Sequence, residues 1–554
     1  MFKRRIAQAA LVWSLLLLCL HPPSLSRSGI ALSASEPPSA AVVDDNAIIS
    51  PIAPLPGPTQ LSPSVLATPP SVNNALLVAG ENQRPGTTAW KITNYAGSGE
   101  IQAYAGDTSV NAGSSLQFYV STRVEGTIYK IDFFRMGWYG GAGARLMTNA
   151  SGLRGMAQGY HTNAGLAGCK RCLADRTTGL LDANWLPSYK LDVPGDWLSG
   201  FYLALLTDRN GKQTYASFVV RQDDRASDLV LKTSVNTYEA YNAWGGKSLY
   251  TYDSGGAVTL GGNSAAVKVS FNRPFDADYG SGQFLRYEYP LVRWIEQAGY
   301  DVTYVTDKDV AENGSLLLQH RGFISAGHDE YWTASERQNV EQALAHGVDL
   351  AFLSGDAVYW QARLEASSSG DQDRTLVVYR NSTDPLYRSD PKHASVRWQD
   401  PPLNDPENIL TGTLYAGQTD PFTQDWVVAD NNSWVFAGTG LKPGDHVGGV
   451  VGKEFDRADP GDRGPYGLQI LSHSPVTTIT AAGRRADVAV SETTIYTAPS
   501  GAIVFSAGTV TWSWGLDETS YLIASLHRGP ASPAIQRLTQ NLLDAFAYGP
   551  PSPP

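Results

Sequence analysis

The sequence predicts a multidomain protein in which an immunoglobulin-like β-sandwich is followed by an α/β domain with a mainly parallel sheet. Two changes of pattern along the chain support this prediction. Residues 75–224 contain short alternating runs of polar and apolar residues separated by turn residues, which is typical of antiparallel strands. Residues 225–550 alternate strand-like apolar runs with segments of helical periodicity, which indicates βαβ units.

The first 74 residues carry signals for export rather than for a folded domain. Basic residues at 3–5 precede an apolar run over 9–20 and then small residues, so residues 1–35 are predicted to be a secretory signal peptide. An uncleaved membrane anchor is the alternative. Residues 36–74 are rich in Pro, Ser and Ala, a composition typical of an extended linker. We therefore expect a secreted, periplasmic or cell-surface protein whose mature chain has no membrane span.

The predicted sandwich consists of short strands joined by turns, one of them marked by Asn210 and Gly211. An aromatic, glycine-rich segment at 137–143 lies between two of these strands. We expect this segment to pack against the next domain rather than to line a ligand surface. The strand-like runs lie at 115–120, 127–133, 200–206 and 218–221.

Two cysteines, Cys169 and Cys172, remain once the predicted signal peptide is removed. A Cys-x-x-Cys pair can be a redox site or half of a zinc site. The sequence has no second such pair and no nearby pair of histidines to support zinc, and no βαβ pattern to support thioredoxin-like chemistry. In an exported protein, a local disulfide within a loop is the favoured interpretation.

The α/β domain is predicted to have the layering of glutamine amidotransferases and flavodoxins, with helices on both faces of the sheet. Between about 365 and 499 the pattern is irregular and partly β, which we interpret as an insertion in the same domain. Helices are expected over 291–297, 334–345 and 534–546. The expected strands are 229–235, 300–305, 321–326, 348–353 and 502–506.

Charge and motifs exclude several classes of function. The chain has 42 Lys and Arg against 53 Asp and Glu, a net charge of −11, which disfavours nucleic acid and anionic membranes as partners. No cysteine follows a predicted sheet strand, so thiol catalysis of the glutaminase type is excluded. Serine-hydrolase, P-loop and HExxH motifs are also missing. A small molecule or a glycan is the expected partner.

The segment 327–332, Gly-His-Asp-Glu-Tyr-Trp, is the strongest signal of a functional site. It follows a strand-like apolar run and precedes Thr333 and Glu336, which form a capping-box pattern at the start of a helix. His328 and Glu330 are therefore expected in a strand-to-helix turn. In an open α/β sheet such turns lie at the carboxyl edge, where ligands bind.

Other polar side chains follow the remaining predicted strands, and parallel strands would bring them to the same edge. Phenols, carboxylates and one imidazole suit a hard, Lewis-acidic cation, which can polarise a carbonyl and lower the pKa of water. The alternative roles are core packing for the tyrosines, helix capping for the aspartates and orientation of the turn for His328. The additional side chains are Tyr238, Tyr241, Asp307, Asp309 and Asp356.

The chain resembles the large (β) subunit of N,N-dimethylformamidase and the wider family that shares its C-terminal region. The most specific match is the 327–332 segment together with Tyr359 and Trp360. The resemblance implies a mononuclear iron amidohydrolase that acts on linear amides, with the metal held by two tyrosines and one glutamate. The matching segments are 237–242, 248–250, 325–332, 347–360 and 508–515.

The resemblance also implies roles for individual residues. Glu330 matches the glutamate that binds the metal, and His328 matches its neighbour, which would act as general base or orient water. Tyr250 matches one tyrosine ligand. For the other ligand Tyr241 is preferred to Tyr238, because an asparagine follows it.

Glu454 matches a further active-site glutamate of the family, while other features depart from the family pattern. The export signal, the linker and the short spacing between Tyr241 and Tyr250 differ from those of a cytoplasmic amidase, and no small subunit is visible in the chain. The natural substrate and the oligomeric state therefore stay open. One alternative is a non-catalytic cell-surface or carbohydrate-binding protein, favoured by the aromatic residues at 138–139 and 512–514. Another is a hydrolase of glycans or esters that uses the same site.

Overall fold

The computed structural model describes residues 75–172, 174–461, 463–479, 485–518 and 530–550. These residues belong to one compact unit, Leu66–Pro554. The predicted signal peptide and linker lie outside the described residues, so both stay predictions. None of the helices in the described ranges is long and apolar enough to cross a membrane.

The centre of the structure is a mostly parallel sheet of seven strands. In their order across the sheet they are β13 (Val302–Thr306), β11 (Leu229–Thr233), β14 (Gly322–His328), β16 (Asp349–Gly355), β25 (Ile503–Ser506), β24 (Thr494–Thr497) and β21 (Gln469–Ile470). The first five run parallel, and β24 and β21 are antiparallel to their neighbours. The prediction of a mainly parallel sheet is confirmed, and the five parallel strands are the five predicted.

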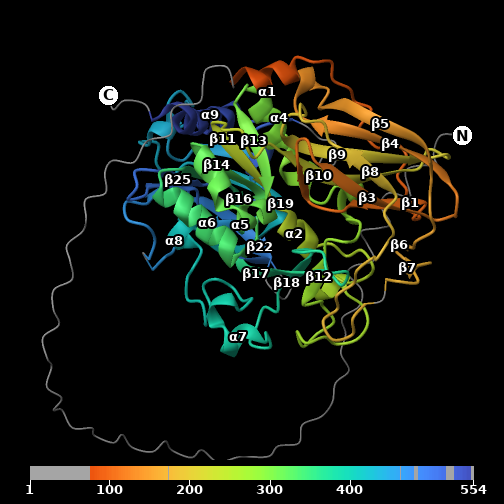
Figure 1. Cartoon of the computed structure of the whole chain (residues 1–554). Coiled ribbons are helices and arrows are strands. Elements are labelled where there is room, and N and C mark those ends of the chain that lie inside the picture. Colours follow the sequence, from red (N-terminus) through yellow and green to blue (C-terminus); the bar gives the residue numbers. More distant parts are fainter. Residues whose placement is uncertain (1–74, 173, 462, 480–484, 519–529, 551–554) are drawn as a thin grey trace, which may run out of the picture. The chain divides into compact units, whose positions relative to one another are not determined.

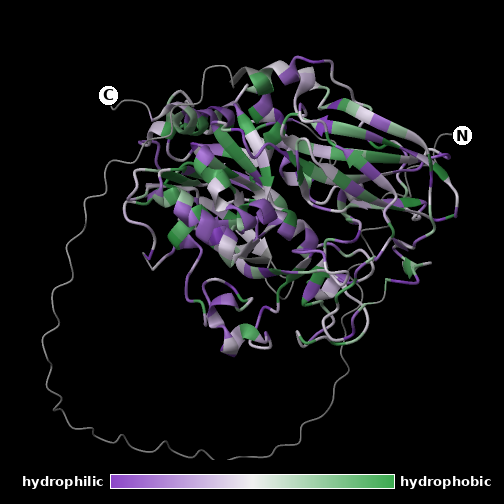
Figure 2. Cartoon of the chain, viewed as in Figure 1, coloured by the Kyte–Doolittle hydropathy of each residue, from purple (hydrophilic) through white to green (hydrophobic). Residues whose placement is uncertain are grey.

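Helices cover both faces of this sheet (Figure 1). They include α2 (Val235–Ala240), α4 (Tyr289–Gln297), α5 (Asp307–Glu312), α6 (Ala334–Ala345) and α9 (Pro533–Tyr548). Leu229 and Leu231 of β11 pack in one hydrophobic cluster with α4 and α9, whereas Val230 between them packs with α5 and α6. Successive side chains of a strand point to opposite faces, so the continuous apolar run of β11 serves both layers. In Figure 2 the strands of the sheet are largely green and α6 is largely purple.

Two mainly antiparallel sheets precede the central sheet in the chain. One consists of β1 (Ile101–Ala105), β3 (Ser115–Thr122) and β8 (Tyr189–Asp192), and the other of β2 (Ser109–Asn111), β10 (Gln213–Arg221), β9 (Gly200–Asp208), β4 (Ile128–Met136) and β5 (Ala144–Arg154). Only the pair of β2 and β10 is parallel within these two sheets. Phe118 of β3 shares a hydrophobic cluster with Phe133 of β4 and Phe218 of β10, so the two sheets bury their side chains against each other.

The five-stranded sheet is joined to the central sheet by a continuous core. Phe134 of β4 and Leu203 of β9 share a hydrophobic cluster with Leu291 of α4. Arg135 of β4 forms a fully buried ion pair with Glu296 of α4, with 2.7 Å between Nη2 and Oε1. The predicted sandwich and the α/β part therefore pack as one body rather than as two loosely linked modules.

The glycine-rich segment at 137–143 packs against α4, as expected from the sequence. The hydroxyl of Tyr289 donates a hydrogen bond to the carbonyl oxygen of Gly143 at 2.9 Å. The guanidinium of Arg293 lies 4.8 Å above the ring of Trp138. Both contacts come from one helical face, which explains why this wide loop is ordered without strand pairing.

Residues 365–499 contain more regular structure than their sequence pattern indicated. A four-stranded sheet follows the order β20 (His446–Arg457), β19 (Leu414–Val427), β22 (Ser474–Ile479) and β23 (Arg485–Ser491). The same region supplies β24 and β21 at one edge of the central sheet. A further four-stranded sheet joins β12 (Lys268–Ser270), β18 (Thr375–Val377), β17 (Trp360–Glu365) and β15 (Tyr331–Thr333).

Candidate active site

The candidate site lies at the carboxyl ends of the central strands. β14 ends at His328, and Glu330 follows in the turn between β14 and the short strand β15, which leads into α6. Gly327 has a φ of +72°, and a Cβ at this position would lie 2.6 Å from the Cβ of Tyr287. Glycine suits both this backbone conformation and this close approach. Asp356 follows β16, the neighbouring parallel strand.

The two preferred tyrosines contact the predicted glutamate ligand. The hydroxyl of Tyr241 donates to Oε2 of Glu330 at 2.7 Å, and the hydroxyl of Tyr250 lies 3.1 Å from both carboxylate oxygens. The two rings stack with their centroids 4.3 Å apart. The hydroxyl of Tyr238 instead donates to Glu288. The geometry therefore favours Tyr241 over Tyr238 as the partner of Glu330.

His328, Glu454 and Asp356 form a second buried group beside Glu330. Nε2 of His328 lies 2.7 Å from Oε2 of Glu454, 3.8 Å from Oδ2 of Asp356 and 3.3 Å from Oε2 of Glu330. Nε2 of His328, Oε2 of Glu454 and Oδ1 of Asp356 have no aligned hydrogen-bond partner among the described residues. Buried polar atoms normally have such partners. These three side chains could hold a metal ion, whose identity is open.

An irregularity in the pairing of β19 and β20 positions Glu454. The register shifts between the pair Gln418–Glu454 and the pair Thr423–Gly452, and Lys453 adopts a φ of +53° at this point. Such bulges redirect side chains and are common next to active sites. Nε2 of Gln418 donates to Oε1 of Glu454 at 2.6 Å, which fixes the carboxylate.

Burial and neighbouring charges shift the pKa values of the site. Burial, and then the charge of Glu330, raise the pKa values of Tyr241 and Tyr250 well above their usual range. Burial alone would lower the pKa of His328, but the carboxylate of Glu454, and then those of Asp356 and Glu330 nearby, raise it well above its usual value. Burial opposes ionisation of Glu454, yet His328 and Lys453 lower its pKa to about 2. His328 and Glu454 thus form an imidazolium–carboxylate pair.

The sequence analysis missed Arg380 and Tyr331, which both contact Tyr250. The guanidinium of Arg380 lies 4.3 Å above the ring of Tyr250 and donates to the carbonyl oxygen of Leu249 at 2.6 Å. It also donates to the hydroxyl of Tyr331, which lies 2.8 Å from the hydroxyl of Tyr250. These partners are 131 and 49 residues from Arg380 in the chain, so no local pattern could reveal the contact.

A buried lysine anchors the turn of the candidate site. Nζ of Lys232 lies 2.5 Å from Oδ1 of Asp307, 2.7 Å from Oδ1 of Asp329 and 2.7 Å from Oε1 of Glu336. Asp329 lies between His328 and Glu330 in the sequence, so its ion pair with Lys232 fixes the backbone that carries both residues. Asp309 completes the capping box of α5. Asp307 and Asp309 therefore serve the fold rather than the ligand set.

The structure brings all five side chains of the predicted site together from three segments of the chain, which are the loop after α2, the end of β14 with the turn that follows it, and β20. The oxygen atoms of Tyr241, Tyr250 and Glu330 lie next to the pair of His328 and Glu454. The site belongs to an α/β protein with a mostly parallel central sheet. The chain belongs to the family described as N,N-dimethylformamidase β subunit-like, C-terminal, whose model matches residues 130–525, more than half of the chain. None of the curated proteins compared with the chain matches it.

Solved structures that show some similarity to the chain include the following two. A superoxide reductase (neelaredoxin) from Ignicoccus hospitalis is 10% identical, with 23% of this chain and 81% of that chain covered and a TM-score of 0.13. A cycloisomaltooligosaccharide glucanotransferase from Paenibacillus, complexed with cycloisomaltoheptaose, is 9% identical, with 81% of each chain covered and a TM-score of 0.16. Similarity at this level carries no argument about fold or function.

Proposed function

We propose that the protein is an exported, metal-dependent hydrolase that cleaves the C–N bond of an amide. The observation that carries this proposal is the contact of the Tyr241 and Tyr250 hydroxyls with the Glu330 carboxylate, next to the pair of His328 and Glu454. Membership of a family named for its similarity to N,N-dimethylformamidase supports the same reaction class.

Tyr241, Tyr250 and Glu330 are the proposed ligands, and iron is the proposed metal. Phenolate and carboxylate oxygens are hard donors that suit a Lewis-acidic cation. Each phenol must lose its proton to become a phenolate ligand, and the charge of Arg380 above the ring of Tyr250 favours that anion. The bound cation would polarise the substrate carbonyl and lower the pKa of water in the site.

The pair of His328 and Glu454 would carry the proton transfers. Glu454 takes a proton from the attacking water as the C–O bond forms, and His328 gives a proton to the leaving nitrogen as the C–N bond breaks. The proton on Glu454 then returns to His328 across their contact of 2.7 Å, and the products are a carboxylic acid and an amine. In this scheme His328 is the acid, whereas the family resemblance implied a general base or a group that orients water.

A second placement of the metal is favoured by the orphaned atoms of His328, Asp356 and Glu454. An imidazole and two carboxylates would then bind the ion, and the histidine would no longer be free to transfer protons. Asp356 distinguishes the two placements. It is a ligand only in the second placement, and it takes no part in the proposed proton transfers. Asp356→Asn keeps the metal in the first placement and weakens its binding in the second.

Metal analysis of the purified full-length protein tests the proposal. We expect near-stoichiometric iron in the wild type, loss of iron in Glu330→Ala and Tyr250→Phe, and wild-type iron content in Asp356→Asn. Loss in Asp356→Asn with retention in Tyr250→Phe would establish the second placement. Folded wild-type protein that binds no metal would contradict both.

The reaction class is tested by a panel of linear amides, esters and glycosides. Metal-dependent release of an amine from at least one amide is the expected result. Metal-dependent cleavage of an ester or a glycoside, with every amide left intact, would assign the same site to another class of hydrolase.

We further propose that residues 75–224 form an immunoglobulin-like sandwich and residues 225–550 the catalytic domain. The shared core of the two antiparallel sheets supports the first part of this division. The buried ion pair of Arg135 and Glu296 predicts that the second part is unstable without the first. Expression of residues 225–554 alone should therefore give insoluble or unfolded protein, and a soluble, folded product would contradict this expectation.

A further inference from the structure

A cavity with a volume of about 600 Å³ lies outside the candidate active site, next to the three-stranded sheet. Cavities of this size accommodate small ligands. The chain segment around the cysteine pair forms one wall, and β1 and β3 contribute aromatic residues. The side chains that define its chemistry are Tyr104, Tyr119, Trp185, Lys170, Arg171 and Asn184.

Three aromatic rings line part of this cavity. The rings of Tyr104 and Tyr119 are parallel to within 3°, with their centroids 4.8 Å apart, and Trp185 follows at 5.5 Å from Tyr104. Tyr104 and Trp185 are buried, whereas Tyr119 is half-buried. Tyr119 therefore provides the aromatic surface that a ligand can reach. A flat aromatic ring with a polar hydroxyl suits a ligand that is apolar on one face and polar at its edge, as a sugar ring is.

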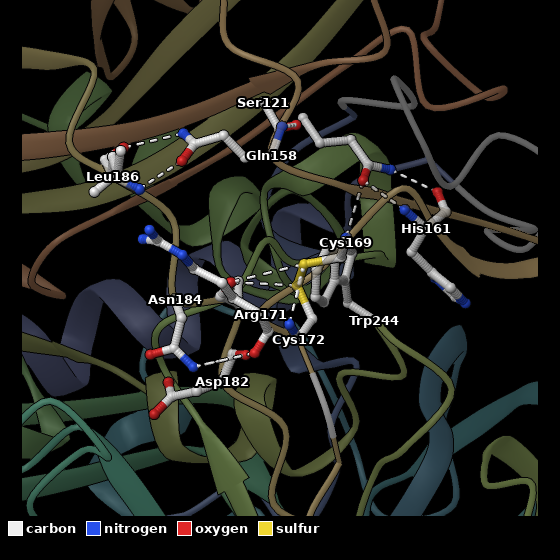
Figure 3. The surroundings of a disulfide bond; sticks show 12 residues. Ser121, Gln158, His161, Cys169, Arg171, Cys172, Asp182, Asn184, Leu186 and Trp244 are labelled. Atoms are coloured by element: carbon white, nitrogen blue, oxygen red, sulfur yellow. Dashed lines mark hydrogen bonds between the residues drawn. A yellow bond between two sulfur atoms is a disulfide. The ribbon is translucent and has the colours of Figure 1, made fainter.

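A disulfide holds two cations at the edge of the cavity. Cys169 and Cys172 are bonded, as expected from the sequence, so Lys170 and Arg171 lie at the tip of a closed loop. Cys172 is buried in a cluster with Trp185, which fixes the base of the loop. Figure 3 shows Arg171 and Asn184 on the same side of the disulfide, and Nδ2 of Asn184 donates to the carbonyl oxygen of Arg171 at 3.5 Å.

The charge at the edge of the cavity is predominantly positive. Asp371 is the single carboxylate among the lining residues, and it accepts hydrogen bonds from the hydroxyls of Ser367 and Ser369 at 3.3 Å and 2.7 Å. Lys170 and Arg171 are exposed and form no ion pair with any residue that the structure describes. The positive charges of Lys170 and Arg171 are therefore largely unneutralised by nearby carboxylates, although the whole chain is acidic.

We propose that this cavity binds an acidic saccharide, with a sugar ring against Tyr119 and its carboxylate between Lys170 and Arg171. Arginine and lysine bind carboxylates through charge-assisted hydrogen bonds. The amide of Asn184 can bond a sugar hydroxyl. A neutral sugar would leave Lys170 and Arg171 without an anionic partner, and a small inorganic anion would make no contact with the ring of Tyr119. The site is separate from the proposed metal site and does not depend on the hydrolase activity.

A glycan array followed by calorimetry on the full-length protein tests this proposal. The array pairs oligosaccharides of glucuronate, galacturonate and mannuronate with neutral counterparts, and at least one acidic series should bind preferentially. For galacturonate, the trimer and its methyl ester share the same rings and differ in charge. If that series binds, we expect the acid to bind about ten-fold more tightly or better, with a difference that shrinks as salt is added.

Variants separate the charge from the aromatic surface. Lys170→Gln combined with Arg171→Gln should abolish the preference for the acid, and Tyr119→Leu should weaken binding of acid and neutral forms alike. Lys190→Gln removes an exposed lysine of β8 that pairs with Asp192, and it should leave binding unchanged. Glu330→Ala should also leave binding unchanged, which separates this proposal from the proposed hydrolase.

Three results would overturn the proposal, provided that the melting temperature of each variant matches that of the wild type. The first is an array in which no acidic saccharide binds. The second is equal affinity for an acidic oligosaccharide and its neutral counterpart. The third is an undiminished preference for the acid in the double variant of Lys170 and Arg171.

Discussion

The protonation of the pair of His328 and Glu454 is set by the contact between the two groups. The carboxylate, 2.7 Å away, helps raise the pKa of His328, and the imidazolium lowers the pKa of Glu454 to about 2. A carboxylate with so low a pKa stays ionised at neutral pH. Asp356 differs, because burial and then Glu330 raise its pKa well above the usual value. The site therefore keeps one acid and one base available at the same time.

Replacement of Glu454 by glutamine removes the base but preserves the shape of the side chain. We expect kcat on an amide substrate to fall by about 10²–10⁴-fold with metal content unchanged, because Glu454 is outside the proposed ligand set. Steady-state kinetics combined with metal analysis checks this expectation. Asp425→Asn, at an exposed carboxylate of β19, should change neither quantity. Loss of metal in Glu454→Gln would show that Glu454 is a ligand.

Local sequence patterns reveal only some residues of the site. His328 and Glu330 stand out because an apolar strand precedes them and a capping box follows. Tyr238 and Tyr241 also follow a predicted strand, but the choice of Tyr241 required the family resemblance. Tyr250 and Glu454 were found only through that resemblance, since each lies far in sequence from its partner in the site. Neither the local patterns nor the family resemblance indicated Arg380, whose guanidinium contacts the ring of Tyr250, 130 residues earlier in the chain.

At the scale of elements, buried ion pairs hold the turn between β14 and β15, the short strand that leads into α6. Lys232 on β11 bonds to carboxylates from the start of α5, from the turn itself and from the first turn of α6. Burial alone would lower the pKa of Lys232, but the three carboxylates raise it well above its usual value. The charge of this lysine therefore links three connections at one edge of the sheet.

Lys232→Met should destabilise the protein by about 3–5 kcal/mol, because it leaves buried carboxylates without their cation. Urea unfolding followed by tryptophan fluorescence measures the loss. Lys190→Met, at an exposed lysine of β8, should change the free energy of unfolding by no more than about 0.5 kcal/mol. A loss below about 1 kcal/mol in Lys232→Met would contradict the anchoring role.

Elements with strong local signals were predicted closely. The predicted helix 334–345 coincides with α6, and its capping box of Thr333 and Glu336 is present. The predicted strand 321–326 corresponds to β14, which runs two residues further than expected, to His328, because it keeps its pairing with β16 up to that residue. The register shift at Lys453 had no such signal, because it arises from pairing between β19 and β20.

At the scale of the whole molecule, buried acids couple stability to pH. Glu407 is 1% exposed, and burial raises its pKa from 4.5 to about 8. The folded state therefore binds a proton more tightly than the unfolded state does. The stabilisation from this group is fully present below about pH 4.5 and is lost as the pH rises toward 8.

Glu407→Gln should reduce the dependence of stability on pH. Between pH 5 and 8 we expect the wild type to lose free energy of unfolding on the order of 1–4 kcal/mol through this group, and the variant to lose correspondingly less. Urea unfolding at intervals across this range measures both slopes. A slope in the variant equal to that of the wild type would show that Glu407 ionises normally in the fold.

The central claim is that the phenols of Tyr241 and Tyr250 bind the metal together with Glu330. The most direct test is the visible absorption spectrum of the protein during titration with ferric iron, because phenolates bound to ferric iron absorb visible light by charge transfer. The wild type should develop this band, and Tyr241→Phe and Tyr250→Phe should each weaken or abolish it. Tyr252→Phe, at a ring 5.3 Å from that of Tyr250 and 70% exposed, should retain it. Iron binding without the band, or a band unchanged in both variants, would contradict the claim.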